Sequence, residues 1–169
     1  MKGSRVIFAA AAVGVCFGVG QVVSFAQSKA GSPVTGVWRV VEVTTTGQNA
    51  RTVTNPQPGL YIFTANHYAI EMVNRDAPRS ELPPEGQRTD KQIADAFGPF
   101  TANAGSYEVK GNEITFKRMV AKDPGNMKAG NFQIVTFRLE GKSTLFVTGK
   151  ANDAGPAQNP TTIKLTRIE

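Results

Sequence analysis

The chain of 169 residues contains one cysteine, Cys16, one histidine, His67, and one tryptophan, Trp38. A single cysteine cannot form an intramolecular disulfide, and a lone histidine supports neither a catalytic triad nor a zinc site. Phosphate-binding loops and the Gly-x-Ser-x-Gly pattern of hydrolases are also absent from the sequence. We therefore interpret His67 as a surface residue and predict no catalytic residues, no metal and no cofactor.

The sequence also has no run of like charge. Its 19 basic and 13 acidic residues are scattered, without the basic tracks interleaved with aromatics that mark nucleic-acid binding. We predict no nucleic-acid partner. The mild positive charge would favour weak contact with anionic lipid at most.

A long apolar run occurs only at the N-terminus. Lys2 and Arg5 precede residues 6–23, which are rich in Ala, Val and Gly, and small residues follow at 24 and 26. This order of basic, apolar and small residues is typical of a secretory signal peptide. We expect residues 1–26 to be removed and the protein to be exported, to the periplasm or the extracellular space.

Two alternatives concern the same segment. A retained membrane anchor is one, because 18 residues, 6–23, reach the lower limit for a spanning helix, although Gln21 and several glycines count against it. A lipoprotein is the other, but Val15 precedes Cys16 where a lipobox has Gly or Ala. Signal cleavage would leave no stable membrane span. It would also leave no cysteine, so one ordinary hydrophobic core must stabilise the domain at 35–169, after a short linker at 27–34.

Period-two alternation of apolar and polar residues dominates this domain and predicts β-strands. Turn residues separate the segments closely enough to force antiparallel neighbours. We predict an all-β fold, an eight-stranded antiparallel up-and-down β-barrel, because closing the sheet hides its edges. The eight predicted strands are 35–46, 59–64, 67–74, 105–110, 113–120, 132–139, 143–149 and 161–168.

One short helix is expected between strands 3 and 4. After a proline-containing loop at 76–87, Thr89 and Gln92 have the spacing of a capping box, and Gly98-Pro99 would end the helix. Phe100 would then lie in the exit loop. The apolar face of this helix could act as a lid on the barrel or as a structural plug, and we favour the plug. Residues 151–160 are expected to form a long loop.

Several short motifs resemble a known family. Gly36-Val37-Trp38 on the first strand and Arg167 on the last resemble the lipocalin pattern. Further segments are similar to the bacterial lipocalin-like domain, a calycin-type family: Thr35 to Val43, Pro58 to Tyr61, His67 to Met72, Asp123 to Asn126 with Gly130, and Gln133 to Gly141. The resemblance implies a barrel whose closed end is formed by Gly36, Trp38 and Arg167, with a binding cavity and no established activity.

Strand parity predicts which residues face the lumen if Trp38 points inward. Most of them are apolar or aromatic, which suits a pocket for a small hydrophobic molecule and equally a filled core. The candidate ligand-lining residues are Val40, Glu42, Tyr68, Ile70, Met72, Tyr107, Phe116 and Arg118.

Two of these residues, Glu42 and Arg118, carry charge. Burying either alone is costly, so parity suggests an internal ion pair or a site for a polar ligand group. A β-bulge in either strand would turn one of them outward, and a solvated position at the rim is the other alternative.

Three classes of function fit this pattern. We favour an exported binder of a small hydrophobic molecule. A lipid cyclase or isomerase that shapes a reactive ligand in the cavity is the first alternative, so enzymatic activity stays undecided, and a packed structural or interaction barrel is the second. The sequence sets no oligomeric state.

Overall fold

The computed structural model describes residues 31–169, so the predicted signal peptide, 1–26, and half of the predicted linker lie outside the described residues. The described part contains ten strands, one α-helix and two 3-10 turns, Gly47–Asn49 and Pro124–Met127. The helix is α1 (Asp90–Phe97). The strands are β1 (Gly36–Thr45), β2 (Arg51–Val53), β3 (Gly59–Phe63), β4 (His67–Val73), β5 (Phe100–Lys110), β6 (Glu113–Ala121), β7 (Gln133–Glu140), β8 (Thr144–Asn152), β9 (Gly155–Pro156) and β10 (Thr161–Arg167).

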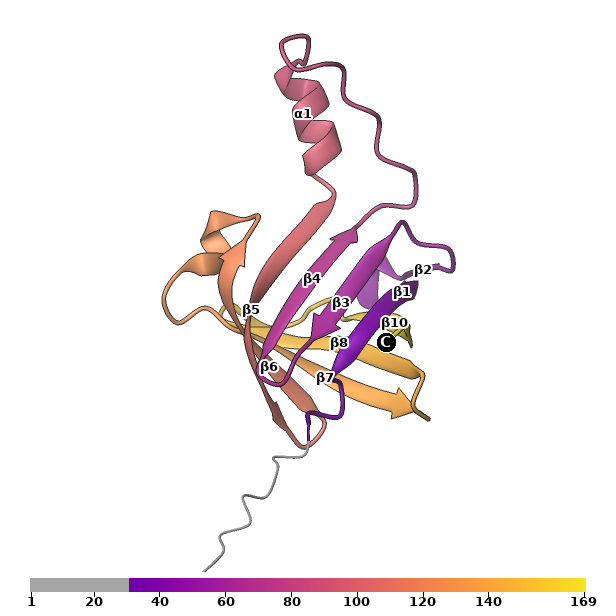
Figure 1. Cartoon of the computed structure of the whole chain (residues 1–169), viewed down its shortest axis with the longest axis vertical. Coiled ribbons are helices and arrows are strands. Elements are labelled where there is room, and N and C mark those ends of the chain that lie inside the picture. Colours follow the sequence, from indigo (N-terminus) through magenta and orange to yellow (C-terminus); the bar gives the residue numbers. More distant parts are fainter. Residues whose placement is uncertain (1–30) are drawn as a thin grey trace, which may run out of the picture. The chain divides into compact units, whose positions relative to one another are not determined.

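Eight of these strands form a closed barrel (Figure 1). Antiparallel neighbours follow one another in the order β1-β3-β4-β5-β6-β7-β8, and β10 pairs with both β8 and β1 to complete the ring. The predicted all-β, eight-stranded, antiparallel up-and-down barrel is thus confirmed. Two short strands were not predicted. Strand β2 pairs with the end of β1. Strand β9 pairs with the end of β8 and lies within residues 151–160, which were expected to form a loop.

The helix has the predicted start but not the predicted place in the strand order. The capping box at Thr89 and Gln92 is present, with both reciprocal hydrogen bonds formed. The position between strands 3 and 4 is wrong, because α1 follows β4 once the short strand β2 is counted. Phe100 is the first residue of β5 instead of part of an exit loop, so β5 continues directly from the end of the helix.

The preference for a plug is also wrong. Of the helical residues only Ala96 is buried, whereas Ile93 is 40% exposed and Phe97 is 49% exposed. Figure 1 shows α1 standing away from one end of the barrel, above β4 and β5. The apolar residues of the helix therefore complete no core, because few described residues pack against them.

The core fills the barrel near the opposite end, where β1 begins and β10 ends. Trp38, Ile114, Leu145 and Leu165 are fully buried there. Aromatic rings add edge and tilted contacts, with centroids 5.3 Å apart for Phe63 and Tyr107, and 4.4 Å apart for Tyr68 and Phe116. Such pairs stabilise a core beyond their buried area, by about 0.5–1.5 kcal/mol each.

Trp38 and Arg167 seal this end. The Trp38 indole N–H donates to the carbonyl of Val34 at 2.8 Å, and the Arg167 guanidinium lies 4.0 Å from the indole ring centroid. Arg167 also donates to the backbone carbonyls of Thr35 and Lys142, at 2.6 and 2.7 Å. A buried indole and a cation on its face stabilise the fold by about 2–3 and 0.5–2 kcal/mol respectively.

Gly36 is required at the closed end by two independent constraints. Its φ of +136° is disfavoured for L side chains, and a Cβ atom would lie 2.2 Å from Arg167 Nη1 and 2.5 Å from the Glu169 carbonyl oxygen. Any side chain at this position therefore displaces the arginine that covers Trp38.

We expect Gly36→Ala to lower the free energy of unfolding by about 2–4 kcal/mol, since backbone strain and a steric clash add. Gly141→Ala is the matched control: its φ is +61°, but nothing lies within 4 Å of the added Cβ. The control should lose about 1 kcal/mol. Urea unfolding measures both, and equal losses would show that the contact with Arg167 contributes nothing.

Candidate functional site in the barrel lumen

A β-bulge in β1 changes which of its residues face the lumen. The pairing with β10 shifts between Val40, opposite Leu165, and Glu42, opposite Lys164. Val43 then pairs with Ile163 and packs against the core. The predicted inward position of Glu42 is therefore wrong, because one extra residue in the strand reverses the side of every residue after it.

A second bulge lies where β5 pairs with β6. Gly105 pairs with Arg118, whereas its neighbour Ala104 pairs with Val120, which leaves Met119 as the extra residue. The strands approach so closely here that a Cβ on Gly105 would lie 2.0 Å from the carbonyl oxygen of Lys117. The bulge lies just beyond Arg118, so Arg118 keeps the inward face predicted for it.

Arg118 lines a cavity of about 420 Å³ at the end of the barrel from which α1 extends. Small-molecule pockets are commonly about 300–1,000 Å³. The deep side is apolar, with Tyr61, Ile70 and Met72, each about 6% exposed. The outer part is polar. It includes Asn74, Thr101, Asn103, Arg118, Lys122, Asp123, Asn126 and Gln133, beside Phe100 and Gly98.

The guanidinium of Arg118 is held by neutral partners. It donates to Asn131 Oδ1 at 2.7 Å and to Gln133 Oε1 at 2.6 Å. The predicted ion pair with Glu42 does not form, and within residues 31–169 no carboxylate lies in salt-bridge range of Arg118. Arg118 thus places a half-buried positive charge at the cavity wall, oriented by two side-chain amides.

Tyr68 connects the apolar and polar parts. Its hydroxyl donates to Asn103 Oδ1 at 2.9 Å, while its ring packs on Phe116. Burial raises the pKa of Tyr68 to about 12, and the nearby charge of Arg118 acts in the opposite direction. Burial also raises the pKa of Tyr61, whose hydroxyl contacts the sulfur of Met72. Both phenols are therefore neutral hydrogen-bonding groups near pH 7.

Apart from Glu42, the predicted lining residues divide into two groups. Ile70, Met72 and Arg118 line the cavity. The second group, Val40, Tyr68, Tyr107 and Phe116, is buried in the core but does not line this cavity.

Sequence reasoning missed Asn103 and Lys122. Asn103 lies before the predicted strand 105–110, whereas β5 begins at Phe100, and Lys122 lies just beyond the end of β6. Binding residues often lie in the loops that follow strands, so the position of Lys122 just after a predicted strand could have drawn attention to it.

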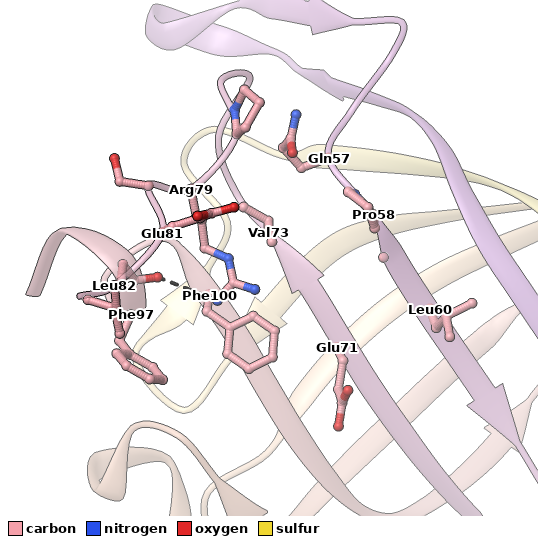
Figure 2. A pocket seen from close by; sticks show the side chains of 14 residues that line it. Gln57, Pro58, Leu60, Glu71, Val73, Arg79, Glu81, Leu82, Phe97 and Phe100 are labelled. Carbon is pink, nitrogen blue, oxygen red and sulfur yellow. Dashed lines mark hydrogen bonds between the residues drawn. The ribbon is translucent and has the colours of Figure 1, made fainter. Parts of the chain in front are cut away.

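A larger groove, of about 630 Å³, lies on the outside of the barrel. Figure 2 shows Leu60 of β3 and Glu71 of β4 on its floor. Its other side is formed by Arg79 of the loop before the helix, Phe97 of α1 and Phe100 of β5. The Arg79 guanidinium lies 5.0 Å from the Phe100 ring centroid. The groove is more open to solvent than the lumen cavity, which lies inside the barrel, so the lumen cavity is the stronger candidate site.

Residues 31–169 contain no group of three or more His, Cys, Asp or Glu side chains placed to hold a metal ion. Nor does any helix among these residues have the length and hydropathy needed to cross a membrane.

Comparison with known proteins identifies one family. The lipocalin-like domain family matches residues 35–166. Among solved structures, a lipocalin-like protein from Bacteroides uniformis is 12% identical, with 81% of this chain and 100% of that chain covered and a TM-score of 0.45. An uncharacterized protein from Bacteroides eggerthii is 12% identical (79% and 98% covered, TM-score 0.42), and a redesigned β-barrel is 13% identical (81% and 93% covered, TM-score 0.41). No curated protein matches the chain.

The raised pKa of Tyr68 predicts a loss of stability in alkali. The ordinary pKa of tyrosine is 10.0, so between pH 10 and pH 12 the folded chain holds a proton that the unfolded chain has lost. The free energy of unfolding must then fall as pH rises through this window, by about 2 kcal/mol from Tyr68. Denaturant unfolding of the wild type and of Tyr68→Phe at several pH values measures this. The variant should show the shallower decline, and parallel curves would contradict the assignment.

Proposed function

We propose that this chain, which belongs to the lipocalin-like domain family, binds a small and largely apolar molecule in the open half of its barrel. The observation that carries this proposal is the cavity of about 420 Å³, with an apolar floor and a polar rim. Small-molecule sites combine apolar surface with placed polar groups, and this cavity has both, with the polar groups in the majority.

The distribution of packing inside the barrel supports the proposal. Trp38 and the aromatic cluster fill the closed half, where Phe63 and Phe116 are each 2% exposed. The cavity begins above this cluster, at Tyr61, Ile70 and Met72. A molecule entering from the α1 end would therefore displace no core side chain, and the closed end would act as a rigid base.

The open end offers further room beside this cavity. A second hollow of about 350 Å³ shares Met72 and Asn74 with it and extends between the end of β1 and the short strand β2. The polar wall containing Arg118 lies on the other side, on β6. A ligand longer than the first cavity could thus extend between the two hollows without leaving the open end.

We also propose that the protein is exported. The composition of residues 1–26 supports this, with its basic start, apolar centre and small residues before position 27. A binder exported in this way would meet its ligand outside the cytoplasm.

Filling the cavity should weaken binding. Ile70→Phe adds volume at the apolar floor, and we expect the affinity for the neutral fluorophore N-phenylnaphthylamine to fall about tenfold. Ile62→Phe is the matched control, because Ile62 lies on the outer face of β3 and is 38% exposed. Fluorescence titration reports both. Absence of saturable binding to the wild type, or equal loss in both variants, would refute a site in the lumen.

Export predicts a mature N-terminus at Gln27. When the full chain is expressed in a Gram-negative host, intact mass measurement of the periplasmic fraction should give residues 27–169. Ala26→Leu, which places a bulky residue where the peptidase requires a small one, should leave the leader attached. A wild-type product that keeps Met1 would contradict the signal-peptide assignment.

A further inference from the structure

The rim of the lumen cavity carries more positive than negative charge. Its ionisable side chains are two cations, Arg118 and Lys122, and one anion, Asp123. The Asp123 carboxylate is already engaged, because it accepts the backbone N–H of Gly125 at 2.9 Å and caps the turn Pro124–Met127. The cavity therefore has a surplus of one positive charge on its wall.

Arg118 has hydrogen-bonding capacity left over. A guanidinium has five N–H donors, and two of them are given to Asn131 and Gln133. Both acceptors are neutral amides, and Asn131 in turn donates to Asp153 at 3.1 Å. These two hydrogen bonds fix the orientation of the guanidinium. They do not neutralise its positive charge, because both acceptors are neutral, so an anion can still bind it. An ionised acceptor makes hydrogen bonds roughly twice as strong as a neutral one.

Lys122 is held by the end of the helix. Its ammonium donates to the carbonyl oxygens of Phe97, of Gly98 at 2.9 Å and of Phe100 at 2.8 Å. The last turn of α1 contains no basic residue of its own, so Lys122 of the neighbouring segment supplies the cation that complements the C-terminal end of the helix dipole. These carbonyls are neutral, and a carboxylate is a stronger partner for the same ammonium.

We propose that the lumen cavity selects an amphiphile with one acidic group, whose anion binds Arg118 and Lys122 while its apolar part lies on Tyr61, Ile70 and Met72. This inference rests on the proposed function and names the ligand class of that site. One arginine and one lysine, partly offset by Asp123, match a single negative charge better than a doubly charged phosphate. The ligand acid and the helix carbonyls compete for the same lysine, so binding loosens the last turn of α1.

The experiment compares two probes with the same number of carbons and different head groups, the anionic decanoic acid and the neutral decan-1-ol, by calorimetric titration at pH 7. We expect the acid to bind the wild type at least about tenfold more tightly, which is the strength of a charge-assisted hydrogen bond. Equal affinities, or tighter binding of the alcohol, would overturn the proposal. Failure of both probes and of N-phenylnaphthylamine would instead refute the proposed function itself.

Variants locate the acid group. The ratio of acid to alcohol affinity should fall about tenfold in Arg118→Met, and about two- to fivefold in Lys122→Met, because Lys122 is exposed and solvent screens its charge. Arg118→Lys restores the charge and should recover part of the ratio. Lys142→Met is the matched control, since this lysine lies at the closed end. An unchanged ratio in both Arg118→Met and Lys122→Met would overturn the assignment, as would an equal fall in Lys142→Met. Thermal unfolding checks that each variant is folded.

Hydrogen exchange tests the competition for Lys122. The backbone N–H of Gly98 donates to the Ala94 carbonyl at 2.7 Å at the end of α1. Saturation with decanoic acid should speed exchange of this amide, whereas saturation with decan-1-ol should not. If both probes leave its rate unchanged, Lys122 does not leave the helix and the coupling is refuted.

Discussion

The pairing of β10 with both β1 and β8 is the constraint on which the rest of the structure depends. It closes the sheet, and Arg167 at the end of β10 then covers Trp38 and bonds three backbone carbonyls from separate segments. Gly36 makes room for this side chain because it has none of its own. With one end sealed and filled, the lumen cavity lies at the other end of the barrel.

Two β-bulges decide the polarity of that space. The bulge in β1 turns Glu42 away and brings Val43 inward, which removes the carboxylate that could have neutralised Arg118. The bulge between β5 and β6 lies beyond Arg118, so this residue stays inside. The lumen thus contains a cation oriented by two amides, where regular alternation would have placed an ion pair. On the proposed function, a site of this kind favours an anionic ligand group over a neutral one.

Helix α1 links the site to the outer surface. Its capping box fixes the first turn, and Lys122, beyond β6, holds the last one. Ile93 and Phe97 are left exposed, so little apolar packing opposes movement of the helix. An element held mainly by end contacts belongs to the least stable part of a fold and is well suited to respond to a ligand.

The sequence by itself determined the eight barrel strands apart from the first part of β5, their antiparallel order, the start of the helix at Thr89 and the apolar face that includes Ile70 and Met72. These features follow from local patterns, namely alternation, turn residues and capping. Only the tertiary structure decided the orientation of Glu42, because a bulge arises from the fit between two strands distant in sequence. It alone also brought Arg118 and Lys122 to the wall of one cavity together with β4, the end of α1 and the start of β5. Periodicity specifies which residues of a strand lie on the same face. Packing between strands specifies whether that face lies inside the barrel and which residues it contacts.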